Sequence, residues 1–153
     1  MVSLDHGWLC QQLVERAPDA IVVADPKGVI LLWNAGAEAI FGYTATEALG
    51  QTLDLIVPER QRERHWAGFD RVMETGVTRY GARDLLAVPA TRKDGGRISL
   101  EFSIVLLKEP SGKVQGIAAI MRDVTARWQQ DRELRQRLAA LEAQAPGRGP
   151  AGS

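Results

Sequence analysis

The sequence WNAGAEAIFGY, residues 33–43, decides how the first half of the chain folds. Asn34 is of a type that caps helices, because its side-chain oxygen accepts hydrogen bonds from the free amides of the first turn. Gly42 is typical of a helix end, where the chain passes through a left-handed conformation. Together they predict a short helix over residues 35–41. A helix of this length is unstable alone, so we expect it to pack on neighbouring strands.

Those strands are predicted just before the helix. Residues 20–24 and 29–33 are apolar runs joined by the turn sequence Asp25-Pro26-Lys27-Gly28, which predicts a β-hairpin. Residues 4–16 precede them and are predicted to form a helix with Ser3 as its N-cap.

Two more helices are expected after Gly42. The capping box Thr44-Ala45-Thr46-Glu47 starts a short one. Pro58 opens a longer one over residues 59–74, which Gly76 closes. Within it Phe69 lies on an apolar stripe, and His65, one turn earlier, falls inside the same stripe.

Three strands are predicted in the second half, over residues 83–91, 97–107 and 114–121. Asp94-Gly95 is a strong hairpin signal between the first two. A polar helix then extends to about residue 144. This order predicts an α+β fold in which helices gather on one face of a single antiparallel sheet.

Composition and motifs exclude several functions. The chain has 153 residues, with 19 basic and 19 acidic side chains, so no net field attracts nucleic acid. Cys10 is the single cysteine, which excludes an internal disulfide and a thiolate zinc site. No apolar run is long enough for a bilayer, and no secretion signal is visible, so we expect a cytoplasmic protein without membrane contact. Phosphate-loop, metalloprotease and nucleophile-elbow motifs are absent, so we expect no catalytic residues, no metal and no enzyme activity.

Several short motifs, in order, resemble those of PAS sensory domains of the S-box/PAC type. They are Asp19-Ala20-Ile21 with the turn 25–28, the stretch 33–43, Leu49-Gly50 with Pro58-Glu59, Arg92-Lys93-Asp94-Gly95, and Asp123-Val124-Thr125. The resemblance covers about residues 16–124. It implies a five-stranded antiparallel sheet in the order 2-1-5-4-3, with helices enclosing a pocket on one face. It divides the chain into an N-terminal flanking helix (1–16), the PAS domain (17–125), a C-terminal signalling or coiled-coil helix (126–144) and a disordered tail (145–153).

The resemblance also implies a function. Such domains bind a small molecule inside the pocket and pass the signal through the C-terminal helix, often as homodimers, to a kinase of a two-component system or to a transcription regulator. The residues expected at the pocket are His65, Phe41, Ile56, Phe69, Val72, Met73, Leu100, Phe102, Ile104, Ala118 and Ile120. The alternative is a dimerisation adaptor without ligand, whose interior is filled by its own aromatic side chains. The sequence specifies neither the ligand nor the effector, nor whether the chain is free-standing or a fragment.

Two cofactors can be weighed against these residues. Flavin photosensors of this family need a reactive cysteine where this chain has Leu53, and Cys10 lies in the leading helix, so a flavin photoadduct is excluded. Haem is the second alternative. His65 follows Pro58 by seven residues, as the proximal histidine does in the oxygen-sensing histidine kinases, and Arg71 matches a basic position of those sensors. Their distal arginine has Arg83 as its nearest counterpart. This partial resemblance implies a haem-binding gas or redox sensor with His65 on the iron.

Overall fold

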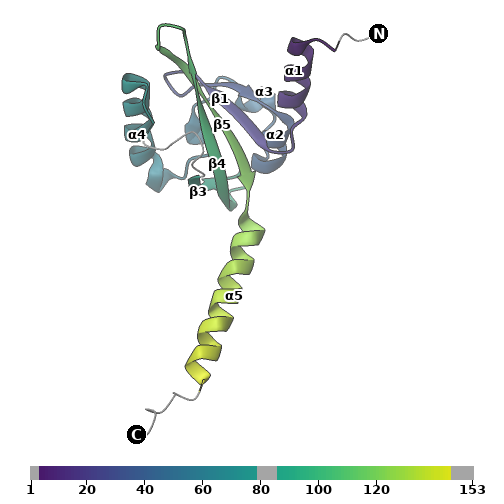
Figure 1. Cartoon of the computed structure of the whole chain (residues 1–153), viewed down its shortest axis with the longest axis vertical. Coiled ribbons are helices and arrows are strands. Elements are labelled where there is room, and N and C mark those ends of the chain that lie inside the picture. The colour runs from purple at the N-terminus through teal and green to yellow at the C-terminus, as the bar shows by residue number, and fades with distance from the viewer. Residues whose placement is uncertain (1–3, 79–85, 146–153) are drawn as a thin grey trace, which may run out of the picture.

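Five antiparallel strands form one sheet in the order β2-β1-β5-β4-β3 (Figure 1). The structure is a computed structural model that describes residues 4–78 and 86–145. The strands are β1 (Ala20–Ala24), β2 (Ile30–Trp33), β3 (Leu86–Thr91), β4 (Arg97–Lys108) and β5 (Val114–Asp123). The helices are α1 (His6–Arg16), α2 (Ala35–Phe41), α3 (Ala45–Ala48), α4 (Arg62–Thr75) and α5 (Thr125–Gln144), with short 3-10 turns η1 (Leu53–Leu55) and η2 (Glu59–Gln61). The predicted α+β fold and strand order are confirmed.

The predicted caps of α2 and α3 are also confirmed. The Asn34 side chain accepts a hydrogen bond from the Ala37 amide at 2.9 Å, and Gly42 ends α2 with a φ of 83°. Thr44 and Glu47 form both hydrogen bonds of a capping box at α3. Local hydrogen bonds of this kind can be read from the sequence, because donor and acceptor lie within one helical turn.

Two predicted helix starts are wrong by two and three residues. Asp5, whose side chain accepts from the Trp8 amide at 2.8 Å, caps α1, which therefore begins at His6. The predicted cap Ser3 lies outside the described residues. Pro58 precedes the tighter turn η2, and the regular helix α4 starts only at Arg62.

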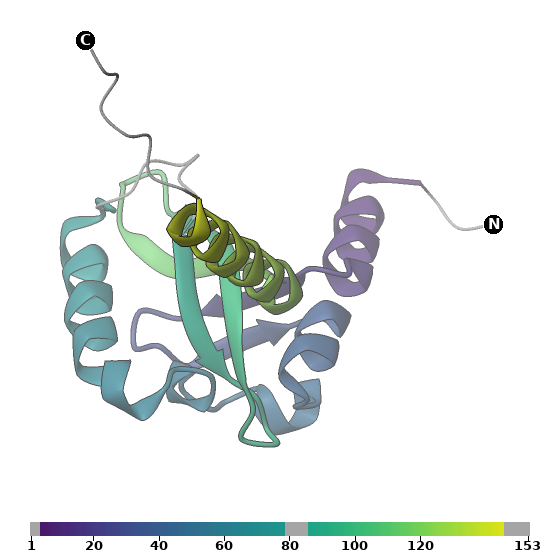
Figure 2. The ribbon, with the colours of Figure 1, turned by 90° about the horizontal axis from the view of Figure 1, so that it is seen from below.

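The helices α2, α3 and α4 lie over one face of the sheet. Figures 1 and 2 show α4 towards one end of this helical layer and α2 with α3 towards the other end. The buried core includes residues of all five strands and of α2 and α3, and within it Phe41 of α2 packs on Trp33 with ring centroids 5.3 Å apart. The helix α5 leaves the sheet at the end of β5 and projects away from the body of the fold (Figure 1).

The helix α2 approaches the start of β1 so closely that only glycine fits at position 36. A Cβ on Gly36 would lie 2.2 Å from the carbonyl oxygen of Asp19, and that oxygen belongs to the backbone and cannot swing aside. Gly68 in the middle of α4 is the opposite case, because a Cβ there has nothing within 4 Å. Close packing therefore requires glycine at position 36, whereas nothing around position 68 requires it.

We expect Gly36→Ala to lower the free energy of unfolding by about 1–3 kcal/mol, because the added methyl group forces α2 off the sheet. Gly68→Ala should raise it by up to about 1 kcal/mol, because alanine favours the helix and meets no neighbour. Urea denaturation of the two variants measures both values. Equal effects of the same sign would contradict this account of α2 packing.

Candidate functional site

A cavity of about 130 Å³ lies between the inner face of the sheet, the η1 segment and α4. Its walls are almost entirely apolar. They are formed by Val22, Ala24, Leu53, Ile56, Val57, His65, Phe69, Val88, Pro89, Ala90, Leu100, Phe102, Ile104, Ile117, Ala119 and Met121. An apolar hollow with few polar groups has the character of a small-molecule site.

The structure brings part of the expected set of site residues together at this cavity. Those that line it are Ile56, His65, Phe69, Leu100, Phe102 and Ile104. The α4 pair His65 and Phe69 share one face, with ring centroids 6.0 Å apart. The three β4 residues alternate along their strand, so their side chains all point to the same side of the sheet.

The predicted placement of Ala118 and Ile120 at the cavity is wrong. Phe102 faces the cavity and pairs with Met121, and residues directly opposite each other share a face of the sheet. Ala119 and Met121 therefore point inward, whereas Ala118 and Ile120 point to the outer face, where Ile120 is 38% exposed.

Three other expected residues lie elsewhere. Phe41 is fully buried against Trp33 in the core under α2 and does not line the cavity. Val72 and Met73 are half-buried in the last part of α4, beyond Phe69, and are likewise not among the lining residues. The end of α4 lies beside the β4–β5 hairpin, because the Lys108 Nζ donates to the Gly76 carbonyl at 2.6 Å.

Several wall residues were not expected. Val22 and Ala24 follow the alternating burial of β1, a pattern that strand periodicity could have revealed. Leu53 and Val57 lie in or beside the short turn η1, where no helical or strand period predicts the direction of a side chain. Ala90 and Ala119 also line the cavity, and their small side chains leave space there.

His65 gives the cavity its chemistry. Among the described wall residues it alone has a polar side chain, and its Nδ1 is buried without a hydrogen-bond partner. Burial lowers the pKa of the imidazole below its ordinary value of 6.5, and the nearby Asp54 carboxylate only partly opposes this. The ring is therefore neutral at pH 7 and can both donate and accept a hydrogen bond.

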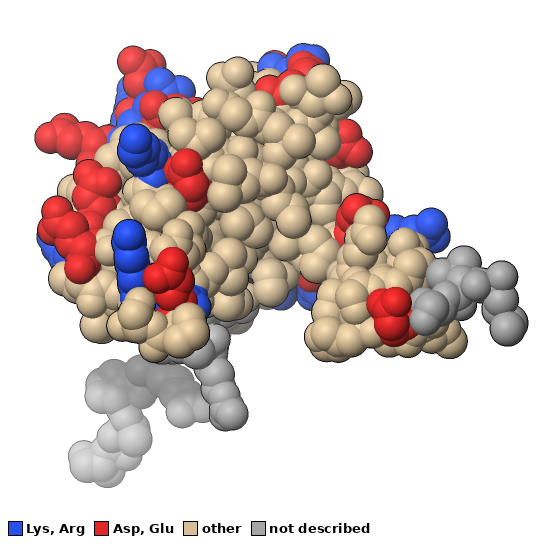
Figure 3. All heavy atoms as spheres, turned by 90° about the horizontal axis from the view of Figure 1, so that it is seen from above, with Lys and Arg blue, Asp and Glu red and all other residues tan. Residues whose placement is uncertain are grey.

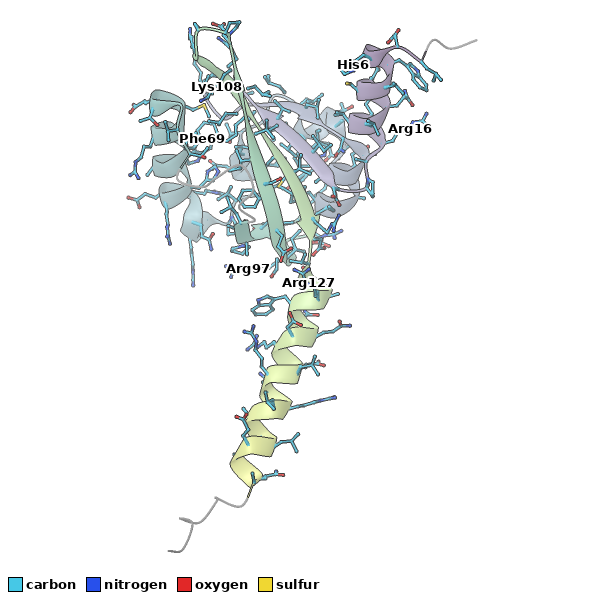
Figure 4. All side chains as sticks on the ribbon, in the orientation of Figure 1. His6, Arg16, Phe69, Arg97, Lys108 and Arg127 are labelled. Atoms are coloured by element: carbon cyan, nitrogen blue, oxygen red, sulfur yellow. The ribbon has the colours of Figure 1, made fainter. Side chains whose placement is uncertain are left out.

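Trp66, next to His65, fixes α4 over the cavity. Its indole Nε1 donates to the Asp54 Oδ1 at 2.7 Å, and its ring centroid lies 5.2 Å from that of Phe69. The ring also presses on the β1–β2 turn, because a Cβ on Gly28 would lie 2.1 Å from it. Phe69, labelled in Figure 4, is thereby held on the side of α4 that faces the sheet.

The strand β4 connects the cavity to α5. The Val124 amide donates to the Ser99 carbonyl and the Ser99 amide donates to the Thr125 hydroxyl, both at 2.9 Å. Glu101 forms an ion pair with Arg127, which Figure 4 places at the start of α5. We call these three interactions the α5 latch.

The cavity fits a haem group only in part. A neutral imidazole among apolar walls has the chemistry of an axial iron ligand. The volume of about 130 Å³, however, is below the 300–1,000 Å³ typical of sites for drug-sized ligands, and a porphyrin is larger than most of these. Arg71 lies on the exposed side of α4, and Arg83 is outside the described residues. The walls would have to move apart before a macrocycle could enter.

The structure also shows where the residues relevant to a flavin photoadduct and to metal binding lie. Leu53 lines the cavity, whereas Cys10 is exposed on α1. Within residues 4–78 and 86–145, no three side chains of His, Cys, Asp or Glu are grouped to hold a metal ion. In the same part of the chain, no helix has the length and apolar character needed to span a bilayer.

Comparison with known proteins places the geometry in context. The family model described as PAS fold matches residues 14–129. Sensor protein FixL of Bradyrhizobium diazoefficiens is 29% identical over 137 residues, which cover 86% of this chain and 25% of that protein. Oxygen sensor protein DosP of Escherichia coli is 26% identical over 123 residues, which cover 79% of this chain and 15% of that protein. The chain thus spans a quarter or less of the length of these two relatives.

A solved structure agrees with this match. The PAS domain of a protein from Colwellia psychrerythraea superposes with a TM-score of 0.69 at 24% identity, covering 80% of this chain and 99% of that one. At this level of identity the likeness concerns the fold.

The lowered pKa of His65 predicts how stability depends on pH. As the pH falls through 6.5 the unfolded chain binds a proton at this imidazole more readily than the folded chain does, so the contribution of His65 to the free energy of unfolding falls on acidification and no longer changes at higher pH. His65→Gln should remove this part of the pH dependence between pH 7.5 and 5.5, as measured by urea denaturation. The control is His6→Gln on the exposed α1, which should keep the wild-type dependence. A wild-type dependence in His65→Gln would contradict the prediction.

Proposed function

The chain belongs to the PAS fold family, and from this premise we propose that it is a sensory domain that reports the occupancy of its internal cavity to an effector through α5. One observation carries the proposal: the wall strands β4 and β5 are the two strands to which α5 is attached. β5 continues directly into α5, and β4 holds it through the α5 latch.

The mechanism is a shift between two conformations. A ligand that binds one conformation more tightly than the other shifts their populations by the difference in its two affinities. Leu100 and Phe102 touch the cavity, and the residues beside them, Ser99 and Glu101, hold α5. A change in the wall that moves β4 therefore changes the start of α5, and this change is the signal.

The effector and the dimer are part of the same proposal. We take the effector to be a kinase or a transcription regulator, the classes that sensory domains of this kind serve. The helix α5 exposes Leu134, Leu138 and Leu141 to 61%, 57% and 65%. Their spacing of four and three residues forms an apolar seam that a second copy of α5 would cover. Two seam positions nearer the sheet are charged, since Arg127 pairs with Glu101 and Asp131 is exposed.

A haem-based gas sensor is the second candidate. The buried Nδ1 of His65 without a partner favours it, as does the similarity to DosP, which is named an oxygen sensor. The ligand-free adaptor is the third candidate. The cavity counts against it, because the interior of such an adaptor would be filled by its own side chains. The absorption spectrum of the protein mixed with haem separates the candidates: a Soret band that His65→Leu abolishes supports haem.

We expect Ala119→Leu to mimic an occupied cavity, because the larger side chain enters the space between β5 and α4. Backbone amide signals of Ser99, Val124 and Thr125 should then shift in the NMR spectrum of the full chain. The matched control is Ala118→Leu, one residue away on the outer face, which should leave the α5 latch unchanged. Identical spectra of the latch residues in both variants would count against transmission from the cavity.

We expect Leu138→Lys to weaken dimers held by α5, because burying the charge in an apolar seam is unfavourable. The dissociation constant from analytical ultracentrifugation should rise by at least about tenfold, the effect of losing one buried leucine contact. Gln136→Lys, on the opposite side of the same helix, should leave it unchanged. A monomeric wild type, or equal constants for both variants, would remove the dimer from the proposal.

A further inference from the structure

We propose that the cavity takes a compact, largely apolar molecule with one hydroxyl group, of which phenol is the simplest aromatic example, and that this hydroxyl pairs with His65. The inference rests on the proposed function, since it names the class of ligand that the sensory cavity binds. Three features of the cavity lead to it: the volume, the composition of the walls and the state of the imidazole.

The volume limits the ligand to about one ring. At about 130 Å³ the cavity is close to the engineered apolar cavity of about 150 Å³ that binds benzene, and it is well below the range for drug-sized ligands. Small side chains on two strands, Ala90 on β3 and Ala119 on β5, leave this space, and Phe69 from α4 bounds it. A nucleotide, a flavin or a porphyrin is larger than this volume.

The walls exclude most polar ligands. Fifteen of the sixteen described wall side chains are apolar, and none carries a fixed charge. A buried charge without a partner is strongly unfavourable, which excludes carboxylates, phosphates and ammonium ions. A sugar or another polyol brings several hydroxyl groups and would find a side-chain partner for only one of them. The ligand therefore has an apolar body and a single polar group.

The imidazole identifies that polar group. The Nδ1 of His65 is buried without a hydrogen-bond partner, an arrangement that a ligand would correct. A neutral imidazole has one donor and one acceptor nitrogen, and a hydroxyl group both donates and accepts. A hydroxyl thus satisfies either tautomer, whereas a ketone or an ether satisfies only one. The Phe69 ring, 6.0 Å from the His65 ring, offers an aromatic ligand an edge or face contact.

The experiment compares phenol with toluene, which has similar size and no hydroxyl group. Both are titrated into the full chain, and affinities are taken from the rise in melting temperature with concentration. We expect phenol to bind wild type at least as tightly as toluene. In His65→Leu the ratio of the toluene to the phenol dissociation constant should fall at least about tenfold, because the buried hydroxyl then lacks a partner. His6→Gln is the matched control and should keep the wild-type ratio.

The outcomes separate this inference from the proposed function. An unchanged ratio in His65→Leu, with both probes bound, overturns the role of His65 and leaves the cavity as a ligand site. If His65→Leu does not fold, wild type alone decides: toluene more than tenfold tighter than phenol overturns the inference. Haem bound with a Soret band, and neither probe bound, overturns the ligand class while sensing stands. Binding of none of the three overturns both.

Discussion

The side-chain amide of Asn34 is the interaction on which the N-terminal half of the structure depends. Its Oδ1 accepts hydrogen bonds from the amides of Ile21 and Ala37 at 2.8 and 2.9 Å, and its Nδ2 donates to the carbonyls of Val14 and Asp19 at 2.8 and 3.1 Å. One residue that is 4% exposed thus joins α1, β1 and α2. Because a buried amide is costly unless its hydrogen bonds are made, these bonds favour this arrangement of the three segments. The close contact of Gly36 with the start of β1 follows from it.

Much of this architecture could be predicted from the sequence, because the signals are local. The caps at Asn34 and Gly42 and the hairpin turns act within four residues, and their order along the chain indicated the fold. The role of Asn34 in joining three segments could not be predicted, since Ile21 and Val14 are 13 and 20 residues away. The prediction of which β5 side chains face inward was wrong for a related reason. The middle of β5 is apolar on both faces, so only its pairing with β4 decides which residues face the cavity. These inward residues shape the cavity.

The cavity exists because small side chains of the sheet lie opposite α4, and α4 is held at a fixed distance from the sheet. Trp66 rests on the β1–β2 turn and is anchored to Asp54, so α4 cannot move closer to the sheet to fill the space above Ala90 and Ala119. Wall atoms that border a void have no contact partners on that side and lose their dispersion attraction. A ligand of the right size restores these contacts, and binding to the folded state alone then raises its stability. On the surface seen from above in Figure 3, charged side chains lie towards the edges and the middle shows no Lys, Arg, Asp or Glu.

Along β4, residues that line the cavity alternate with residues that hold α5. One connection is direct, because β5 runs through the Asp123-Val124-Thr125 motif into α5. The structure adds a second connection of a different kind: successive residues of β4 face the cavity and hold α5 in turn, as Leu100 and Phe102 alternate with Ser99 and Glu101. Successive side chains of a strand point to opposite faces, so the residues of β4 that line the cavity and those that hold α5 are direct neighbours in the chain. Under the proposed function, a movement of β4 at Phe102 passes to its chain neighbour Glu101 and from there to the ion pair with Arg127.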